Sequence, residues 1–115
     1  MAAGPTAIPQ ASAIVVVVGG PPELIEATRQ AAGIAAAARI ETAELANAAT
    51  VIATVRPFAI VMSEDVYAFD AAEFDALARD VNAALLKIDI GSIDASKLER
   101  MLLPKLGRAH RRRQS

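Results

Sequence analysis

The segment from Ala13 to Val18, which reads AIVVVV, limits the possible folds of this chain more than any other segment. β-Branched residues favour strands, and an apolar run without polar alternation is typical of a strand that is buried on both faces. Strands of this kind lie inside parallel sheets, whose neighbouring strands are joined by crossover helices. The run is also far shorter than the roughly 20 apolar residues of a membrane-spanning helix, so we expect no membrane span.

The residues after this run predict alternating helices and strands. The sequence GGPPE ends the first strand, and its prolines suit the first turn of a helix that we expect to end at Gly33. Residues 36–40 fit either a short strand or a continued alanine-rich helix, and we favour the strand because it completes a β-α-β unit. Thr42 can cap a second helix that ends near Val55, and a further strand is expected over residues 58–62.

The clearest helix start lies in the second half of the chain. Asp70 and Glu73 have the spacing of a capping box, and Phe69 and Phe74 have the spacing of a hydrophobic staple. We therefore expect a helix that begins at Asp70 and ends near residue 81.

A fourth strand over residues 83–90 and a last helix over residues 93–106 complete the chain, and Pro104 is expected to bend or end that helix. The order β-α-β-α-β-α-β-α predicts an α/β fold, a flavodoxin-like three-layer α/β/α domain with a mainly parallel four- or five-stranded sheet. A length of 115 residues fits one domain. We divide the chain into a flexible leader, a single domain and a basic flexible tail, at residues 1–12, 13–106 and 107–115.

The amino-acid composition limits both the chemical reactions that this chain can perform and the cellular compartment that we predict for it. The chain is 54% hydrophobic but only 3% aromatic, so its core must be built from aliphatic side chains that pack closely. It contains no cysteine, which excludes a disulfide framework and a thiolate nucleophile. The N-terminus lacks the pattern of a secretory signal, and we predict a cytoplasmic protein.

Ligands of parallel α/β sheets bind at the carboxyl ends of the strands. The residues that we expect to form a pocket there are Gly19, Gly20, Ser63, Glu64 and Asp65. Hard cations prefer oxygen ligands, so a small-ligand or Mg²⁺ site is one alternative. An enzyme would require Ser63 and the two acids to meet a ligand together with Gly19 and Asp89.

Other features argue against catalysis. Pro21 and Pro22 offer no N–H group to a phosphate, which disfavours nucleotide binding at the first turn. His110 is the only histidine and has no carboxylate near it in sequence, while Ser63 lacks the glycines of a nucleophile elbow. We therefore predict no catalytic residue, no cofactor and no metal, and we assign Ser63 to hydrogen bonding of its turn.

The end of the chain is basic. The last eleven residues hold five of the twelve basic residues and none of the thirteen acidic ones, which suits contact with phosphates or with an acidic partner. In the last helix, Leu98, Met101 and Leu102 have the spacing of a single face, which is either ordinary core packing or a partner-binding stripe. The candidate partner contacts are Leu98, Met101, Leu102, Arg111, Arg112 and Arg113.

Two segments resemble the receiver domains of two-component signalling. AIVVVVGGPPELIEATRQAAG is similar to their first strand and helix, and ATVIATVRPFAIVMS is similar to their second helix and third strand. The resemblance places Ser63 at the phosphoacceptor aspartate, and Gly19 and Gly20 at the acidic pair that binds magnesium. Lys87 precedes Ile88 where that family has a Lys-Pro pair, and the chain is one β-α unit shorter than the usual five. The resemblance implies a pseudo-receiver, which signals through protein contacts without phosphotransfer.

A second resemblance, to anti-sigma-factor-antagonist domains, rests on AIVMSEDVYAFDAAEFDALA, although Ala71 stands where their phosphorylated serine would be. We predict a non-catalytic regulatory or scaffold module that acts through protein–protein contacts, either with a protein partner or by self-association. The alternatives are an anti-sigma-antagonist-like regulator, a small-ligand or Mg²⁺-binding α/β protein, and nucleic-acid binding through the basic C-terminal tail.

Overall fold

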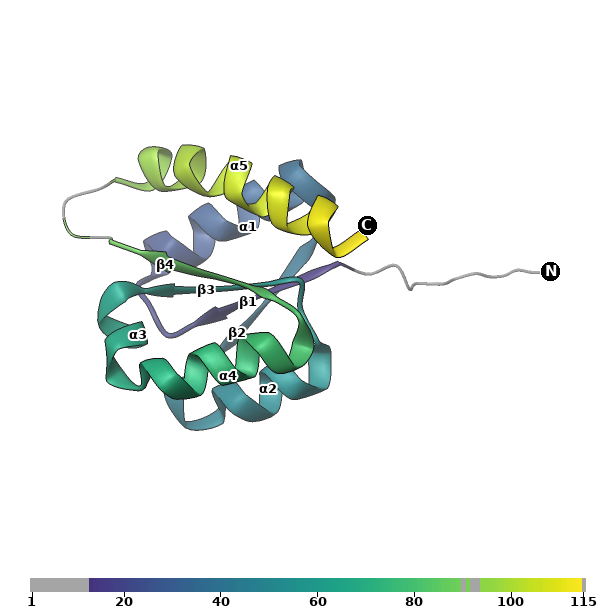
Figure 1. The fold of residues 1–115 in the computed structure, drawn as a ribbon. Helices are drawn as coiled ribbons and strands as arrows, with labels where there is room; N and C mark the ends of the chain where they lie inside the picture. Colours follow the sequence, from purple (N-terminus) through teal and green to yellow (C-terminus); the bar gives the residue numbers. More distant parts are fainter. Residues whose placement is uncertain (1–12, 90, 92–93, 115) are drawn as a thin grey trace.

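The computed structural model describes residues 13–89, 91 and 94–114, in which four strands form one parallel sheet (Figure 1). The strands are β1 (Ile14–Val18), β2 (Arg39–Ala43), β3 (Ala59–Ser63) and β4 (Ala84–Ile88), in the order β2-β1-β3-β4 across the sheet. The helices are α1 (Pro22–Ala36), η3 (Leu45–Asn47), α2 (Ala48–Val55), α3 (Glu64–Phe69), α4 (Ala71–Val81) and α5 (Ala95–Gln114). The leader that we predicted over residues 1–12 lies outside the described residues.

Helices cover both faces of the sheet, which confirms the predicted three-layer α/β class. α1 and α5 lie on one face, and α2 and α4 lie on the other (Figure 1). All five residues of β1 are buried. Val15 and Val17 pack toward α1 and α5, while Val16 and Val18 pack toward α2 and α4. The opening apolar run is therefore a central strand that contributes to both hydrophobic cores.

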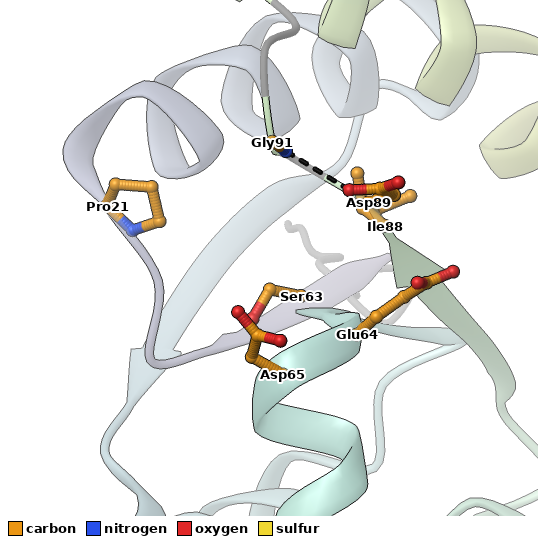
Figure 2. Close-up of a pocket in the computed structure, with 7 residues that line it drawn as sticks. All are labelled: Pro21, Ser63, Glu64, Asp65, Ile88, Asp89 and Gly91. Atoms are coloured by element: carbon orange, nitrogen blue, oxygen red, sulfur yellow. Dashed lines mark hydrogen bonds between the residues drawn. The ribbon is translucent and has the colours of Figure 1, made fainter.

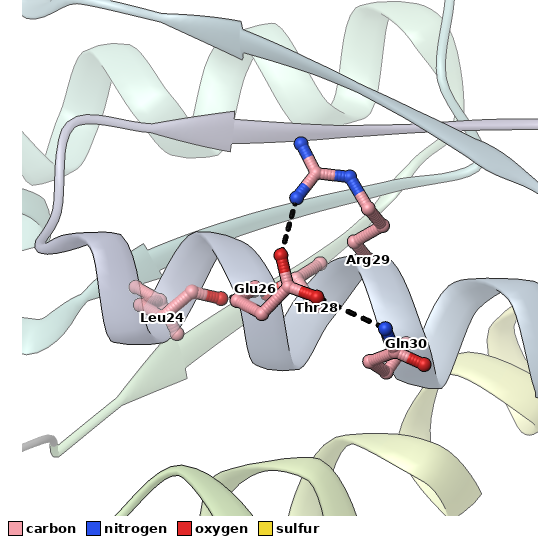
Figure 3. Close-up of polar contacts among 5 residues, drawn as sticks. All are labelled: Leu24, Glu26, Thr28, Arg29 and Gln30. Carbon is pink, nitrogen blue, oxygen red and sulfur yellow. Dashed lines mark hydrogen bonds and ion pairs between the residues drawn. The ribbon is translucent and has the colours of Figure 1, made fainter.

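Helix α1 has a buried face and an exposed face, and its polar side chains form hydrogen bonds on both (Figure 3). Thr28 is fully buried, and its hydroxyl donates to the Leu24 carbonyl oxygen at 2.7 Å, so the core receives no unpaired hydroxyl. On the exposed side, the Glu26 carboxylate accepts hydrogen bonds from Arg29 at 2.6 Å and from Gln30 at 2.9 Å. These hydrogen bonds, with that of Gln30 the larger cause, hold the pKa of Glu26 below its ordinary value.

The boundaries around β2 differ from the predicted ones. α1 continues past Gly33 to Ala36, because a run of alanines favours helix, and Ala37 then closes it in a left-handed conformation with φ of 50°. The strand interpretation of the next segment is confirmed, although β2 starts three residues later than predicted. Thr42 lies within β2, so the predicted helix cap at Thr42 is wrong.

The region after β3 folds into two helices where we predicted one. α4 begins at Ala71, close to the predicted position, but the Asp70 side chain makes no capping hydrogen bond, so the predicted capping box is wrong. The hydrophobic staple is wrong as well, because Phe74 is buried whereas the side chain of Phe69 is 78% exposed. Phe69 belongs to the last turn of α3, and that helix prevents it from folding back onto α4.

Helix α5 corrects the prediction of a flexible tail. It continues through Pro104 to Gln114, so Pro104 does not end it. A proline removes one backbone hydrogen bond from a helix, but Leu102 and Leu106 on either side are fully buried and hold α5 in the core. His110, which lies in the segment that we predicted to be a flexible tail, packs edge-on against Phe58 with ring centroids 5.2 Å apart.

Arg113 anchors the end of α5. Its guanidinium donates to the carbonyl oxygens of Pro57 at 2.7 Å, Arg56 at 3.2 Å and Asn82 at 3.4 Å. Arg56 and Asn82 are the left-handed residues that end α2 and α4, so one side chain ties α5 to both of these helix ends. The structure thus assigns Arg113 a role within the fold, and the partner contact that we predicted there stays a prediction.

The apolar stripe of α5 belongs to the core. Leu98 and Leu102 are 1% and 0% exposed, which makes the prediction of partner contacts at these two residues wrong. Met101 is half-buried and packs against the same cluster. None of the helices in the described residues combines the length and the apolar character that crossing a membrane requires.

We expect Arg113→Ala to lower the free energy of unfolding by about 1–2 kcal/mol, because three carbonyl groups lose a charged donor. Arg112→Ala is the matched control, since Arg112 is the exposed neighbour and carries the same charge. This control should change the free energy by less than about 0.5 kcal/mol. Urea unfolding followed by circular dichroism measures both variants, and equal stabilities would show that Arg113 does not anchor α5.

A second prediction concerns Glu26. Gln30→Ala should raise the pKa of Glu26 toward the ordinary value of 4.5, and Arg29→Ala should raise it as well, because each variant removes a hydrogen bond to the carboxylate. Because the pKa is lowered in the folded state, this contribution to stability is present above the unfolded-state pKa and is lost as the pH falls through the folded-state pKa. An NMR titration of the side-chain carboxyl shift measures the change. A Glu26 pKa that is the same in wild type and Gln30→Ala would contradict the assignment.

Candidate functional site

The carboxyl ends of β3 and β4 border a pocket of about 360 Å³, which we call the Ser63 pocket (Figure 2). Three of the five predicted pocket residues lie in it, together with the Asp89 of the enzyme alternative. The lining residues are Pro21, Ser63, Glu64, Asp65, Ile88, Asp89 and Gly91.

The Ser63 hydroxyl in this pocket is already engaged in local structure. Ser63 is the last residue of β3 and is 5% exposed, and its Oγ accepts a hydrogen bond from the Val66 amide at 3.2 Å. It caps α3, in agreement with the turn role that we assigned to it. A serine nucleophile needs an adjacent base, whereas His110 packs on Phe58, which precedes β3 at the opposite, amino end of the sheet.

The acids around the pocket also serve the fold. Glu64 and Asp65 are exposed in the first turn of α3, where negative charge stabilises the start of a helix. The Asp89 carboxylate accepts a hydrogen bond from the Gly91 amide at 3.1 Å. In Figure 2 the carboxylates of Glu64 and Asp65 point to different sides of the pocket. Across the part of the chain that the structure describes, no three acidic or histidine side chains are grouped so that they could hold a metal ion.

Gly19 and Gly20 line a different pocket from Ser63. Both have positive φ, 60° and 89°, and the Gly19 amide donates to the Ala43 carbonyl oxygen at 2.7 Å. Their pocket, of about 480 Å³, lies at the ends of β1 and β2 and is lined also by Ile25, Thr42, Ala43, Glu44 and Asn47. The five residues that we predicted to form one pocket therefore lie in two separate pockets. The turn after β1 brings Pro21 into the Ser63 pocket, whereas Gly19 and Gly20 line the other one.

An apolar groove of about 540 Å³ lies between the η3–α2 segment and the α3–α4 segment, and we call it the Phe69 groove. Phe69 is 78% exposed and Leu45 is 43% exposed, while the buried Phe74 lies deeper. The two acidic residues of the lining, Asp70 and Glu73, are both exposed. The full lining is Leu45, Ala46, Ala48, Ala49, Phe69, Asp70, Glu73, Phe74 and Leu77.

Tyr67 of α3 contacts two further elements, α4 and β4. Its hydroxyl donates to the Asp75 carboxylate of α4, with oxygen–oxygen distances of 3.0 and 3.1 Å, and the Lys87 ammonium of β4 lies 4.5 Å from its ring centroid. The hydrogen bond to Asp75 raises the pKa of Tyr67 above the ordinary value of 10.0. Lys87, which the receiver resemblance compares with the lysine of a Lys-Pro pair, lies over an aromatic ring of α3.

A basic pocket of about 300 Å³ lies between the outer strand β4 and α5, and we call it the basic edge pocket. Ala84 and Leu86 form its β4 side. Its lining from α5 is Lys105, Arg108, Ala109, Arg111 and Arg112. Arg111 and Arg112, which we predicted as partner contacts in a flexible tail, are thus held by a helix beside the edge of the sheet.

Sequence reasoning missed the Phe69 groove and the part that β4 plays in the basic edge pocket. Phe69 and Leu45 are separated by 24 positions in the chain and are brought together only by packing of α2 against α4. For the basic edge pocket the signal was present, because Lys105, Arg108 and Arg112 have the i, i+3, i+7 spacing of one helix face. That spacing places the three side chains on one face only if the segment is helical, and we predicted a flexible tail from residue 107 onward. The shared face was therefore not predicted.

No family model and no curated protein matches this chain. Among solved structures, the chain is similar to the solution NMR structure of a de novo designed protein with a Rossmann 2x2 fold, with a TM-score of 0.52 and 14% sequence identity. The alignment covers 84% of this chain and 88% of the designed protein. A likeness at this level of identity shows the fold alone, and it agrees with the flavodoxin-like α/β architecture.

We expect Asp75→Asn to lower the pKa of Tyr67 toward 10.0, because the carboxylate that disfavours the tyrosinate is removed. The chain contains one tyrosine and no tryptophan, so absorbance at the tyrosinate band during an alkaline titration reports on Tyr67 alone. Asp80→Asn removes the same charge elsewhere on α4 and should leave the titration in place. A titration that is identical in Asp75→Asn and wild type would rule out the Tyr67–Asp75 hydrogen bond in solution.

Proposed function

We propose that this protein is a non-catalytic regulatory or scaffold module, similar to a pseudo-receiver, that acts by binding another protein. The observation that carries the proposal is the exposed side chain of Phe69 at the mouth of an apolar groove. Burial of a phenylalanine side chain contributes roughly 1.5–3 kcal/mol, so a partner that covers Phe69 gains a substantial part of its binding energy from one residue.

The exposed apolar side chains of this protein are concentrated at that groove. Within the described residues, three large hydrophobic side chains are exposed, and two of them, Phe69 and Leu45, line the Phe69 groove. The third, Ile34, is 63% exposed on α1. Single exposed apolar residues are ordinary, whereas a cluster beside a cavity is typical of a protein-binding surface.

The chemistry of the groove suits an amphipathic helix of a partner protein. Grooves between helices bind such helices through apolar residues at positions i, i+3, i+4 and i+7. Asp70 and Glu73 add negative charge beside the apolar floor. A helix with leucine-type residues on one face and lysine or arginine along its flanks therefore complements both the shape and the charge.

The strand ends support the non-catalytic part of the proposal. Ser63 stands where the resemblance places the phosphoacceptor, and its hydroxyl oxygen accepts the Val66 amide within the cap of α3. Gly19 and Gly20 stand where a receiver has its magnesium-binding acids, and they offer no carboxylate. These features agree with a module that keeps the receiver-like scaffold and uses its surface for contacts with proteins.

The test uses a capped amphipathic model peptide with leucines on one helical face and lysines on its flanks. In a titration of the ¹⁵N-labelled full chain, we expect amide shifts at Leu45, Phe69 and Leu77. Phe69→Ser should weaken binding by at least about fivefold, because the main apolar contact is lost.

Ile34→Ser is the matched control, since it removes an exposed apolar side chain of similar size outside the groove and should bind like wild type. A peptide in which glutamates replace the lysines should bind more weakly, because Asp70 and Glu73 repel it. Shifts that map away from the groove, or equal binding by Phe69→Ser and wild type, would refute the proposal.

A further inference from the structure

The sheet has an open edge at β4, on a different surface from the Phe69 groove. β4 pairs with β3, and none of the described strands pairs with its other side. The Ala84 amide donates to the Phe58 carbonyl oxygen at 3.0 Å, toward β3. Because peptide groups alternate in direction along a strand, the main-chain groups of Leu85 and Lys87 point to the open edge. Unpaired donors and acceptors of this kind form a template for an added strand.

The basic edge pocket lies beside this open edge. Its β4 side is formed by Ala84 and Leu86, which are half-buried because α5 packs mainly against α1 and leaves the outer strand partly uncovered. Lys105, Arg108 and Arg112 lie on one face of α5 and line the pocket. Among the residues that the structure describes, no carboxylate forms an ion pair with any of these three side chains.

We propose that an extended acidic segment of a partner protein adds to the edge of β4 as a fifth strand, with its carboxylates toward Lys105, Arg108 and Arg112. The dimensions agree with this arrangement. Side chains on one face of a strand repeat about every 6.6 Å. Arg108 and Arg112 are four residues apart, which corresponds to about 6 Å along a helix axis. Acidic residues at alternate positions of the segment can therefore meet successive cations while its main chain pairs with Leu85 and Lys87.

Charge decides which occupant the edge accepts. Two β4 edges joined in an antiparallel dimer would form one continuous sheet and place both sets of cations on the same face, where they repel one another. A nucleic acid would meet the cations but lacks the peptide groups that pair with Leu85 and Lys87. Arg113, moreover, is engaged by three carbonyl oxygens and is not available to phosphates. An acidic peptide strand satisfies both the charge of α5 and the main chain of β4.

This inference goes beyond the proposed function, because the β4 edge is a separate surface and its occupant is a strand instead of a helix. The two are also tested by different amides: Leu85 and Lys87 for the edge, and Leu45, Phe69 and Leu77 for the groove. Either proposal can therefore fail while the other stands.

The experiment titrates the ¹⁵N-labelled full chain, at low ionic strength, with a capped heptapeptide in which glutamate alternates with valine. We expect chemical-shift changes and slowed hydrogen exchange at the amides of Leu85 and Lys87, since added-strand pairing protects both. A peptide of the same sequence that is N-methylated at every second residue keeps its charge but cannot pair, and it should lose binding. The double variant Arg108→Glu, Arg112→Glu should weaken binding by roughly tenfold.

The double variant Lys97→Glu, Arg100→Glu is the matched control, because it changes the same charge on exposed positions of the same helix outside the basic edge pocket. It should bind like wild type.

The proposal is overturned if the glutamate peptide does not bind, or if a lysine–valine peptide binds as tightly. Binding of single-stranded DNA that depends on Arg108 and Arg112, without peptide binding or protection of Leu85 and Lys87, would overturn it in favour of a polyanion surface. Protection of these amides that rises with protein concentration alone would overturn it in favour of a second copy.

Discussion

The burial of β1 on both faces is the constraint on which the rest of this structure depends. Every residue of β1 is buried, and successive valines contribute to two separate cores. Each buried valine contributes roughly 1.5–3 kcal/mol, and that gain requires a helical layer on either side of the sheet. It also requires a neighbouring strand on each edge of β1, which β2 and β3 supply through parallel crossovers. Because all strands run in the same direction, the loops that follow them lie at the same end of the sheet, where they line the Ser63 pocket.

Helix α5 combines two properties that are usually separate. Its inner face, with Leu98, Leu102 and Leu106, completes the core under α1. Its last turns carry a cluster of cations on an anchored helix, because His110 packs on Phe58 and Arg113 binds carbonyl oxygens at the ends of α2 and α4. Because α5 is helical to Gln114, these cations project from one helix beside the edge of β4.

The two surfaces that we propose for binding differ in chemistry and in place. The Phe69 groove is apolar with acidic residues in its lining and lies on the α2–α4 side, whereas the basic edge pocket lies on the α5 side. At the strand ends, two polar side chains make internal hydrogen bonds: Ser63 caps α3, and the Asp89 carboxylate accepts from the Gly91 amide in the loop after β4.

The sequence by itself determined the fold class, because the period and composition of local segments decide between strand and helix. AIVVVV predicted the central strand, GGPPE its turn, and the region after Asp70 a helix, and all three are present. The predicted end of α1 was wrong by three residues, because alanines extend the helix from Gly33 to Ala36. Local helix propensity does not show at which residue a helix stops packing against the core. The Ser63 cap was likewise predictable from its position after a strand.

Only the tertiary structure decided which side chains are exposed and which contact residues that are distant in sequence. Phe69 is left outside the core by α3, and Arg113 and His110 are bound by residues more than 50 positions earlier in the chain. The separation of the glycines from Ser63 depends in the same way on the path of one turn. The physical reason is that secondary structure follows from interactions between near neighbours in sequence, whereas exposure and pairing follow from long-range packing that no local pattern contains.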